Sequence, residues 1–153
     1  MLDVFIDADA CPVKEEVYRV ARRNDLAVRV VSNARMRVPH EGRIELVVVP
    51  GDFDAADDWI VEHVGANDIV ISTDIPLAAR CLQKGAVVLR PNGSAFTEDN
   101  IGDALASREL LSQLRDLGQI SGGPAPFDKR DRSTFLQRLE DTVQMIRRRP
   151  KDA

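Results

Sequence analysis

Short apolar runs alternate with amphipathic segments along the chain. The first run, residues 4–6, is too short for a helix in a soluble protein and stops at two aspartates, so it predicts a buried strand. A later run, residues 46–49, is apolar at every position, which predicts a strand covered on both faces. In total, strands are expected within residues 4–6, 26–31, 43–49, 68–74 and 86–89.

Between these runs, apolar residues recur at the spacing of a helix. Such helices are expected at residues 12–24, 52–64, 75–84, 100–117 and 133–149. The alternation predicts an α/β fold of three layers, α/β/α, with right-handed crossovers and a mostly parallel sheet of about five strands. We expect a single domain over residues 1–153, with the helix at about 133–149 packed on it. The Gly/Pro-rich segment 118–132 predicts a functional or partner-contacting loop.

Aspartates stand where the predicted strands end. Asp7 follows the first strand and Asp74 follows the fourth, and open α/β sheets bind ligands at this carboxyl edge. At about 100° per residue, Asp57 points with the apolar stripe of its helix, where a bare carboxylate needs a cationic, metal or substrate partner. We expect Asp7, Asp9, Asp57 and Asp74 to converge. For Asp9, the pattern equally allows the N-cap of the next helix.

Composition narrows the chemistry that these aspartates can support. The chain has 153 residues and a net charge of −4, so bulk charge does not favour binding to polyanions, although a local basic surface remains compatible. Two cysteines without framework spacing indicate reduced thiols and a cytoplasmic protein. Cys11 is expected to pack or shape the site. No run approaches the roughly 18 apolar residues of a membrane span.

Neighbouring carboxylates repel one another and favour a hard cation. Oxygen ligands suit Mg²⁺ or Mn²⁺, whereas His40 and His63 lack the spacing of a zinc site. Neither a Walker A sequence nor GxGxxG is present. Polar residues that can orient a substrate at the same rim are Lys14, Asn33, Arg35, Asn92 and Asn100.

Five motifs occur in order and cover most of residues 2–139. They are DADACPVKEEV, GDFDAADDWI, DIVISTDIPLAARCLQKGA, RPNGSAFTEDNI and GGPAPF. With them the chain resembles the YaiI/YqxD family of uncharacterised bacterial proteins, which in turn resembles PIN-like domains. This resemblance implies a PIN-like fold and an acidic, Mg²⁺- or Mn²⁺-dependent ribonuclease site, with RNA as substrate.

The resemblance also assigns roles to individual acids. It implies metal ligation by Asp7 and Asp74, with Asp57 as the acid carried by a helix and Asp54 as its substitute. Where many PIN-like domains carry a further acid, this chain has Asn92, which is a departure that bears on a fourth ligand and on a two-metal mechanism.

Two other functions remain open on the sequence. In a phosphohydrolase of the haloacid-dehalogenase type, Asp7 would be the nucleophile, Asp9 the acid/base and Ser32 the hydroxyl residue, but Cys11 departs from that pattern. Alternatively, the fold is a non-catalytic module that binds RNA or protein through the basic residues of its loops. These loop residues are Arg35, Arg37, Arg43, Lys129, Arg130 and Arg132. A homo-oligomer is compatible with the sequence, which does not fix the oligomeric state.

Overall fold

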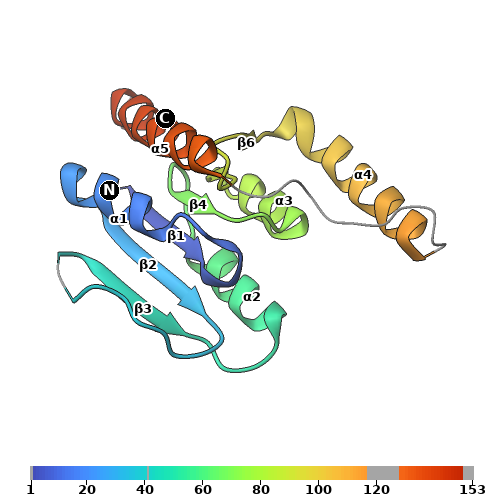
Figure 1. Cartoon of the computed structure of the whole chain (residues 1–153), viewed down its shortest axis with the longest axis horizontal. Helices are drawn as coiled ribbons and strands as arrows, with labels where there is room; N and C mark the ends of the chain where they lie inside the picture. Colours follow the sequence, from blue (N-terminus) through green and yellow to red (C-terminus); the bar gives the residue numbers. More distant parts are fainter. Residues whose placement is uncertain (1, 41, 117–127, 150–153) are drawn as a thin grey trace.

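The computed structural model describes residues 2–40, 42–116 and 128–149. Strands and helices alternate through most of the chain, and all strands form a single sheet in the order β3-β2-β1-β4-β5-β6 (Figure 1). The elements are β1 (Asp3–Asp7), the short 3₁₀ helix η1 (Ala8–Ala10), α1 (Lys14–Asn24), β2 (Ala27–Ser32), β3 (Ile44–Val48), α2 (Phe53–His63), β4 (Ile69–Ile71), α3 (Ile75–Gln83), β5 (Val87–Leu89), β6 (Ala95–Phe96), α4 (Glu98–Asp116) and α5 (Lys129–Arg148).

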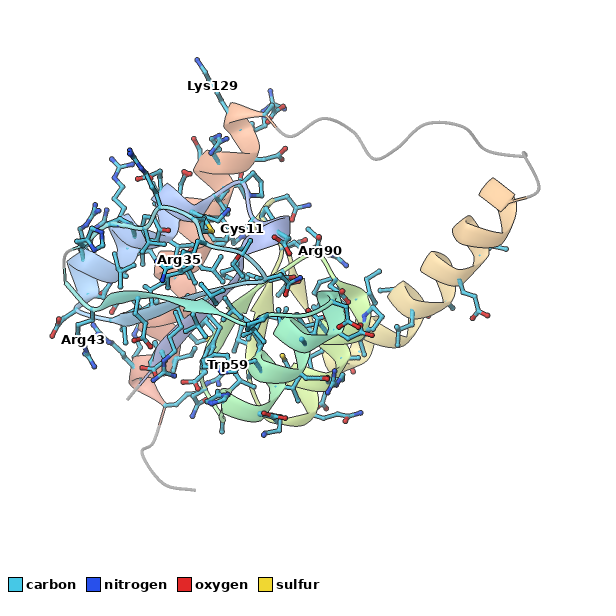
Figure 2. All side chains as sticks on the ribbon, turned by 90° about the horizontal axis from the view of Figure 1, so that it is seen from below. Cys11, Arg35, Arg43, Trp59, Arg90 and Lys129 are labelled. Atoms are coloured by element: carbon cyan, nitrogen blue, oxygen red, sulfur yellow. The ribbon has the colours of Figure 1, made fainter. Side chains whose placement is uncertain are left out.

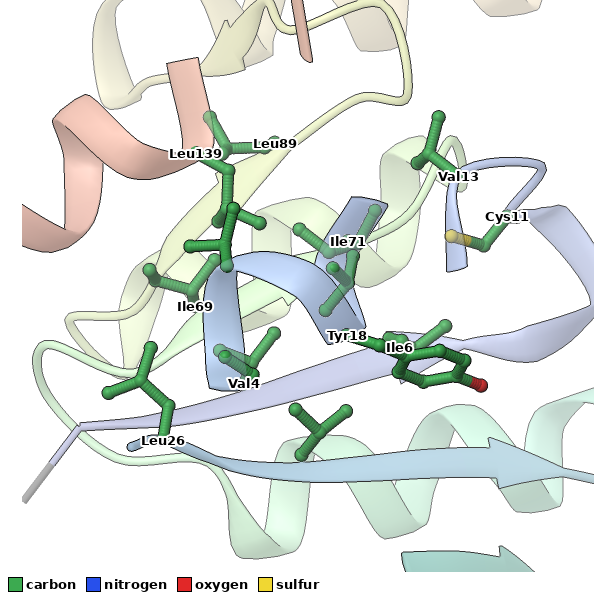
Figure 3. Close-up of a cluster of buried hydrophobic side chains, with 14 of the residues drawn as sticks. Val4, Ile6, Cys11, Val13, Tyr18, Leu26, Ile69, Ile71, Leu89 and Leu139 are labelled. Carbon is green, nitrogen blue, oxygen red and sulfur yellow. The ribbon is translucent and has the colours of Figure 1, made fainter. Parts of the chain in front are cut away.

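The sheet is covered by helices on both faces, which confirms the three-layer α/β/α fold. Strand β1 is central and pairs in parallel with β2 on one side and β4 on the other. Its side chains alternate: Val4 and Ile6 pack with α1 and α5 in one cluster, whereas Phe5 packs with α2 and α3 in the other. Figure 3 shows the first cluster, with Leu139 of α5 above the strands. Because Val4, Phe5 and Ile6 each face one of the two packed layers, the apolar run of β1 has no polar alternation.

Strand β3 corrects one expectation. It lies at the edge of the sheet, beside β2 alone, and Val48 is 38% exposed. The continuous apolar run that ends in Val48 and Val49 therefore does not mark a strand covered on both faces. The position of a strand within a sheet depends on long-range pairing, which a local run of residues does not encode.

Two further boundaries differ from the sequence expectation. A sixth strand, β6, pairs antiparallel with β5 through the turn at 91–94, and its two residues are too few to show a period. Helix α5 begins at Lys129 rather than at 133, because Asp128 and Asp131 form a capping box, each side chain accepting the other residue's backbone N–H. Residues 118–127, which are most of the predicted Gly/Pro-rich loop, lie outside the described residues.

Helix α5 is joined to the rest of the molecule by apolar and polar contacts. Phe135 is fully buried among α1 and strand side chains. Asn24 of α1 donates to Glu140, and Arg132 near the start of α5 donates to the carbonyl of Pro12 at 2.8 Å. The N-terminal end of α5 is thereby attached to the segment that follows β1. None of the helices in the described ranges is long and apolar enough to cross a membrane.

Candidate functional site

The buried carboxylate of Asp7 lies at the carboxyl end of the central strand. Asp7 is only 7% exposed, and its Oδ2 accepts a hydrogen bond of 2.8 Å from Ser72 Oγ, at the end of β4. Burial raises the pKa of the Asp7 carboxyl above its ordinary value; the Ser72 hydrogen bond opposes this, and the charges of Asp74 and Asp9 add to it. A nearby cation would stabilise the ionised form of the Asp7 carboxyl in this position.

Ser72 connects this strand end to the next helix. It is fully buried, and its Oγ accepts the backbone N–H of Asp74 at 2.9 Å while donating to Asp7. Asp74 is the N-cap of α3, where its Oδ1 accepts from the backbone N–H of Leu77 at 3.0 Å. Asp74 therefore has a structural role as well as its place beside Asp7. Sequence reasoning missed Ser72, although its position two residues before Asp74 at a strand end was a usable signal.

The third carboxylate comes from α2. Asp57 is partly buried, and burial followed by the charges of Asp74, Asp7 and Asp54 raises its pKa from 3.8 to about 7. The influence of these charges is compatible with the helical spacing, which predicts that Asp57 faces the strand ends. We call the side chains of Asp7, Asp57 and Asp74 the acidic edge. No ion pair between described residues includes any of the three.

The raised pKa of Asp57 predicts a pH-dependent stability. Between pH 4 and about 7 the folded protein keeps a proton on Asp57 that the unfolded chain releases, so its contribution to stability falls as pH rises through this window. Asp57→Asn removes the titrating carboxyl and therefore removes this loss of stability at high pH. In urea unfolding the variant should gain stability over the natural protein at pH 8 and gain less at pH 5. An equal gain at both pH values would contradict the shift, and Asp58→Asn on the same helix is the matched control.

Two neighbouring acids, Asp54 and Asp9, are exposed. Asp54 is exposed in the first turn of α2 and acts on Asp57 only through its charge. Asp9 is exposed within η1, and the N-cap position of α1 is Val13 without a side-chain cap, so Asp9 does not cap α1. The charge of Asp9 contributes to the raised pKa of Asp7.

Lys14 and Cys11 shape the segment after η1. Lys14 Nζ donates to the carbonyl of Cys11 at 2.9 Å, and its charge lowers the pKa of Asp7, as the smallest of the influences on that group. Burial raises the pKa of the Cys11 thiol to about 11. A thiol that resists ionisation is a poor nucleophile, so the buried Cys11 packs rather than reacts.

The predicted rim residues separate into two kinds. Asn92 and Asn100 are engaged locally: Asn92 Oδ1 accepts from Ser94, and Asn100 bonds the backbone of Thr97 and Ala95. Both stabilise the turns around β6 in the positions seen here. Arg35, after β2, is exposed (Figure 2).

Asn33, also after β2, is different. Its Oδ1 is buried without a hydrogen-bond partner among the described residues. A buried acceptor left without a partner is costly, so this oxygen is available to a donor on a ligand or on water.

One charged residue at this edge was missed by sequence reasoning. Arg90 follows β5, and its guanidinium lies over the ring of Phe96 with 3.9 Å between the guanidinium carbon and the ring centroid. The motif RPNGSAF contained both residues, but only the turn shows that they stack. Figure 2 shows Arg90 on the same side of the molecule as Cys11.

The arrangement can attract a cation without enclosing one. Within the described ranges, no group of three or more His, Cys, Asp or Glu side chains is assembled so that it could hold a metal ion. The donor set, carboxylates with one buried hydroxyl, nevertheless fits Mg²⁺ or Mn²⁺, which keep several water ligands and need only one or two carboxylates. Asp7 and Asp74 are linked through Ser72, whose hydroxyl donates to the Asp7 carboxylate and accepts the backbone N–H of Asp74.

Comparison with known proteins places the chain among bacterial sequences. A family model described as "Uncharacterized BCR, YaiI/YqxD family" matches residues 5–145. The chain is 59% identical to a UPF0178 protein of Rhodospirillum centenum over 97% of this chain and 99% of the relative. It is 56% identical to another of Rhodospirillum rubrum, covering 96% and 99%. No solved structure matches the chain.

Proposed function

The chain belongs to the YaiI/YqxD family, and we propose that it hydrolyses phosphodiester bonds of RNA with Mg²⁺ or Mn²⁺ bound at the acidic edge. The observation that supports this proposal is the buried carboxylate of Asp7 at the carboxyl end of β1, because the charge of Asp74 acts on its pKa and the charges of both act on the pKa of Asp57. Structural acids are commonly paired with Lys or Arg, whereas no ion pair of the described residues involves these three.

The electrostatics of the acidic edge support a cation. Burial and like charges raise the pKa of Asp57 to about 7, which means that they destabilise its ionised form. A divalent cation relieves this repulsion. When bound, it would polarise a phosphoryl oxygen and lower the pKa of a water that attacks phosphorus.

The protein's own groups position that chemistry. Ser72 holds Asp7 in one orientation, because its hydroxyl is fixed by the N–H of Asp74 on its other side. Asp57, whose pKa is raised by the charges of Asp74 and Asp7, would contribute a further carboxylate oxygen to a bound cation. Lys14, whose Nζ donates to the carbonyl of Cys11 and whose charge lowers the pKa of Asp7, would supply positive charge for a substrate phosphate.

Two variants on one helix test the role of Asp57. With Mn²⁺ and mixed single-stranded RNA, Asp57→Asn is expected to lower the cleavage rate by roughly 100-fold, because it removes a cation ligand. Asp58→Asn should cleave like the natural protein, since Asp58 is exposed and paired with Arg80 at 2.9 Å. Gel analysis of the products under single-turnover conditions measures both. Equal losses in the two variants would contradict the proposal.

The rival functions make different predictions in the same assay. A binding module would retain RNA without cleaving it in Mn²⁺. A haloacid-dehalogenase type of hydrolase would form a phospho-aspartate on Asp7, which a beryllium fluoride mimic would trap. The structure favours it less, because Lys84 is at the C-terminal end of α3, opposite Asp74 at its N-terminal end, and donates to the carbonyl of Val61 in α2.

A further inference from the structure

Arg90 presents a positive charge that no acid of the described residues neutralises. It follows β5 directly, and its neighbour Leu89 accepts the backbone N–H of Ser72 at 3.1 Å. Its Nη1 donates to Ser94 Oγ at 3.1 Å, and its plane lies on Phe96. No ion pair between described residues includes Arg90. A half-buried guanidinium is thus held by a neutral hydroxyl and an aromatic face.

The turn that holds Arg90 is itself fixed. The backbone N–H of Arg90 donates to the carbonyl of Ser94 at 2.8 Å, and Gly93 donates back to the carbonyl of Arg90 at 2.9 Å. Gly93 has φ +93°, and a Cβ there would lie 3.1 Å from Thr134 of α5. Only glycine suits both the angle and the contact. Helix α5 therefore supports the turn, and the turn sets the position of the guanidinium.

The strand alternation places Arg90 on the same face of the sheet as the acidic edge. Phe5, Val70 and Val88 belong to the cluster on the α2 and α3 side. Two positions further along the chain are Asp7, the last residue of β1, and Ser72 and Arg90, which directly follow β4 and β5. These three side chains consequently form a row across β1, β4 and β5, and adjacent strands are about 4.8 Å apart. Arg90 stands about 10 Å from Asp7 along this row, measured between strands.

The chemistry of this group selects an anion. A guanidinium keeps a planar fork of donors, and stacking on an aromatic ring fixes the plane while leaving N–H groups free to bind phosphate oxygens. We propose that Arg90 binds a backbone phosphate of the RNA next to the one at the acidic edge. This inference rests on the proposed function, and it assigns Arg90 to substrate positioning rather than to bond cleavage.

The test separates phosphate binding from catalysis. A fluorescein-labelled single-stranded RNA of 12 nucleotides is titrated with the full chain in EDTA, and anisotropy gives Kd at several salt concentrations. Arg90→Gln should weaken binding about tenfold and lower the salt slope by about 0.7, as expected for one lost phosphate contact. Arg90→Lys should fall in between, because it keeps the charge and loses the planar fork. Arg19→Gln, which removes the same charge from an exposed position of α1, is the matched control.

A second variant guards against a folding defect. Ser94→Ala removes the hydroxyl that holds the guanidinium and leaves all charges in place. It should raise Kd about two- to threefold, because one hydrogen bond that positions Arg90 is lost. Equal affinity of Arg90→Gln and the natural protein, or no RNA binding by the natural protein, overturns the inference. Weaker binding by Arg90→Gln without cleavage in Mn²⁺ supports it and contradicts hydrolysis. Cleavage with an unchanged KM in Arg90→Gln overturns it and leaves hydrolysis standing.

Discussion

Replacing Asp7 by asparagine is expected to abolish Mn²⁺-dependent RNA cleavage without destabilising the protein. The substitution removes the most buried negative charge of the acidic edge, and loss of one ligand or charge at such a centre costs on the order of 100- to 1,000-fold in rate. The asparagine Oδ1 can still accept from Ser72, so the hydrogen bond at 2.8 Å is kept.

The stability of the same variant distinguishes a functional acid from a structural one. Burial and the charges of Asp74 and Asp9 raise the Asp7 pKa, so its ionised form opposes folding at neutral pH. Asp7→Asn should therefore unfold at the same temperature as the natural protein or at a higher one, as measured by circular dichroism. A loss of activity accompanied by a large fall in melting temperature would instead indicate that Asp7 serves mainly to hold the fold together.

Truncating Phe135 to alanine is expected to produce the largest loss of stability. The side chain is fully buried where α5 meets α1 and the strands, and removing a buried phenylalanine costs about 3–5 kcal/mol of unfolding free energy. Urea unfolding at pH 7 measures this loss. The contacts of Arg132 with Pro12 and of Gly93 with Thr134 should weaken with it, because α5 carries both partners.

A matched truncation on the same helix provides the control. Met145 is 46% exposed on α5, and its change to alanine should alter the unfolding free energy by less than about 0.5 kcal/mol. If the two variants unfold at the same urea concentration, the packing of α5 on the sheet contributes little to the folded state. A selective effect of Phe135→Ala would show that the last helix is part of one cooperative unit.

Much of the architecture was predictable because it follows from local patterns. The stripe of Phe135, Leu139, Val143 and Ile146 identified the buried face of α5 from spacing alone, and all four are buried. The spacing of Asp57 likewise predicted an acid turned away from water. By contrast, the edge position of β3 depends on the order in which the strands pair, and β6 has only two residues, which it pairs with β5 across a short turn. The sequence of neither segment has a periodicity that indicates its place in the sheet.

The candidate site was predictable to a similar degree. A carboxylate at a strand end is visible in sequence, so Asp7 and Asp74 could be named. Ser72 and Arg90 are ordinary residues in sequence and acquire their roles from neighbours, since one bonds Asp7 from 65 residues away and the other stacks on Phe96. Asn92 and Asn100 show the converse, because polar residues at a rim often complete turns instead of facing a ligand.

The central place of β1 has a consequence for how the protein is made. Among the strands of this sheet, β1 is made before β2, which can pair with it soon afterwards, whereas its other side waits for β4. Until residue 72 has emerged, Asp7 has no hydroxyl to bind, and one edge of the central strand is open to wrong partners. The acidic edge is thus assembled by a late event in folding. A nascent chain that ends before residue 72 contains Asp7 but lacks the serine that binds its carboxylate.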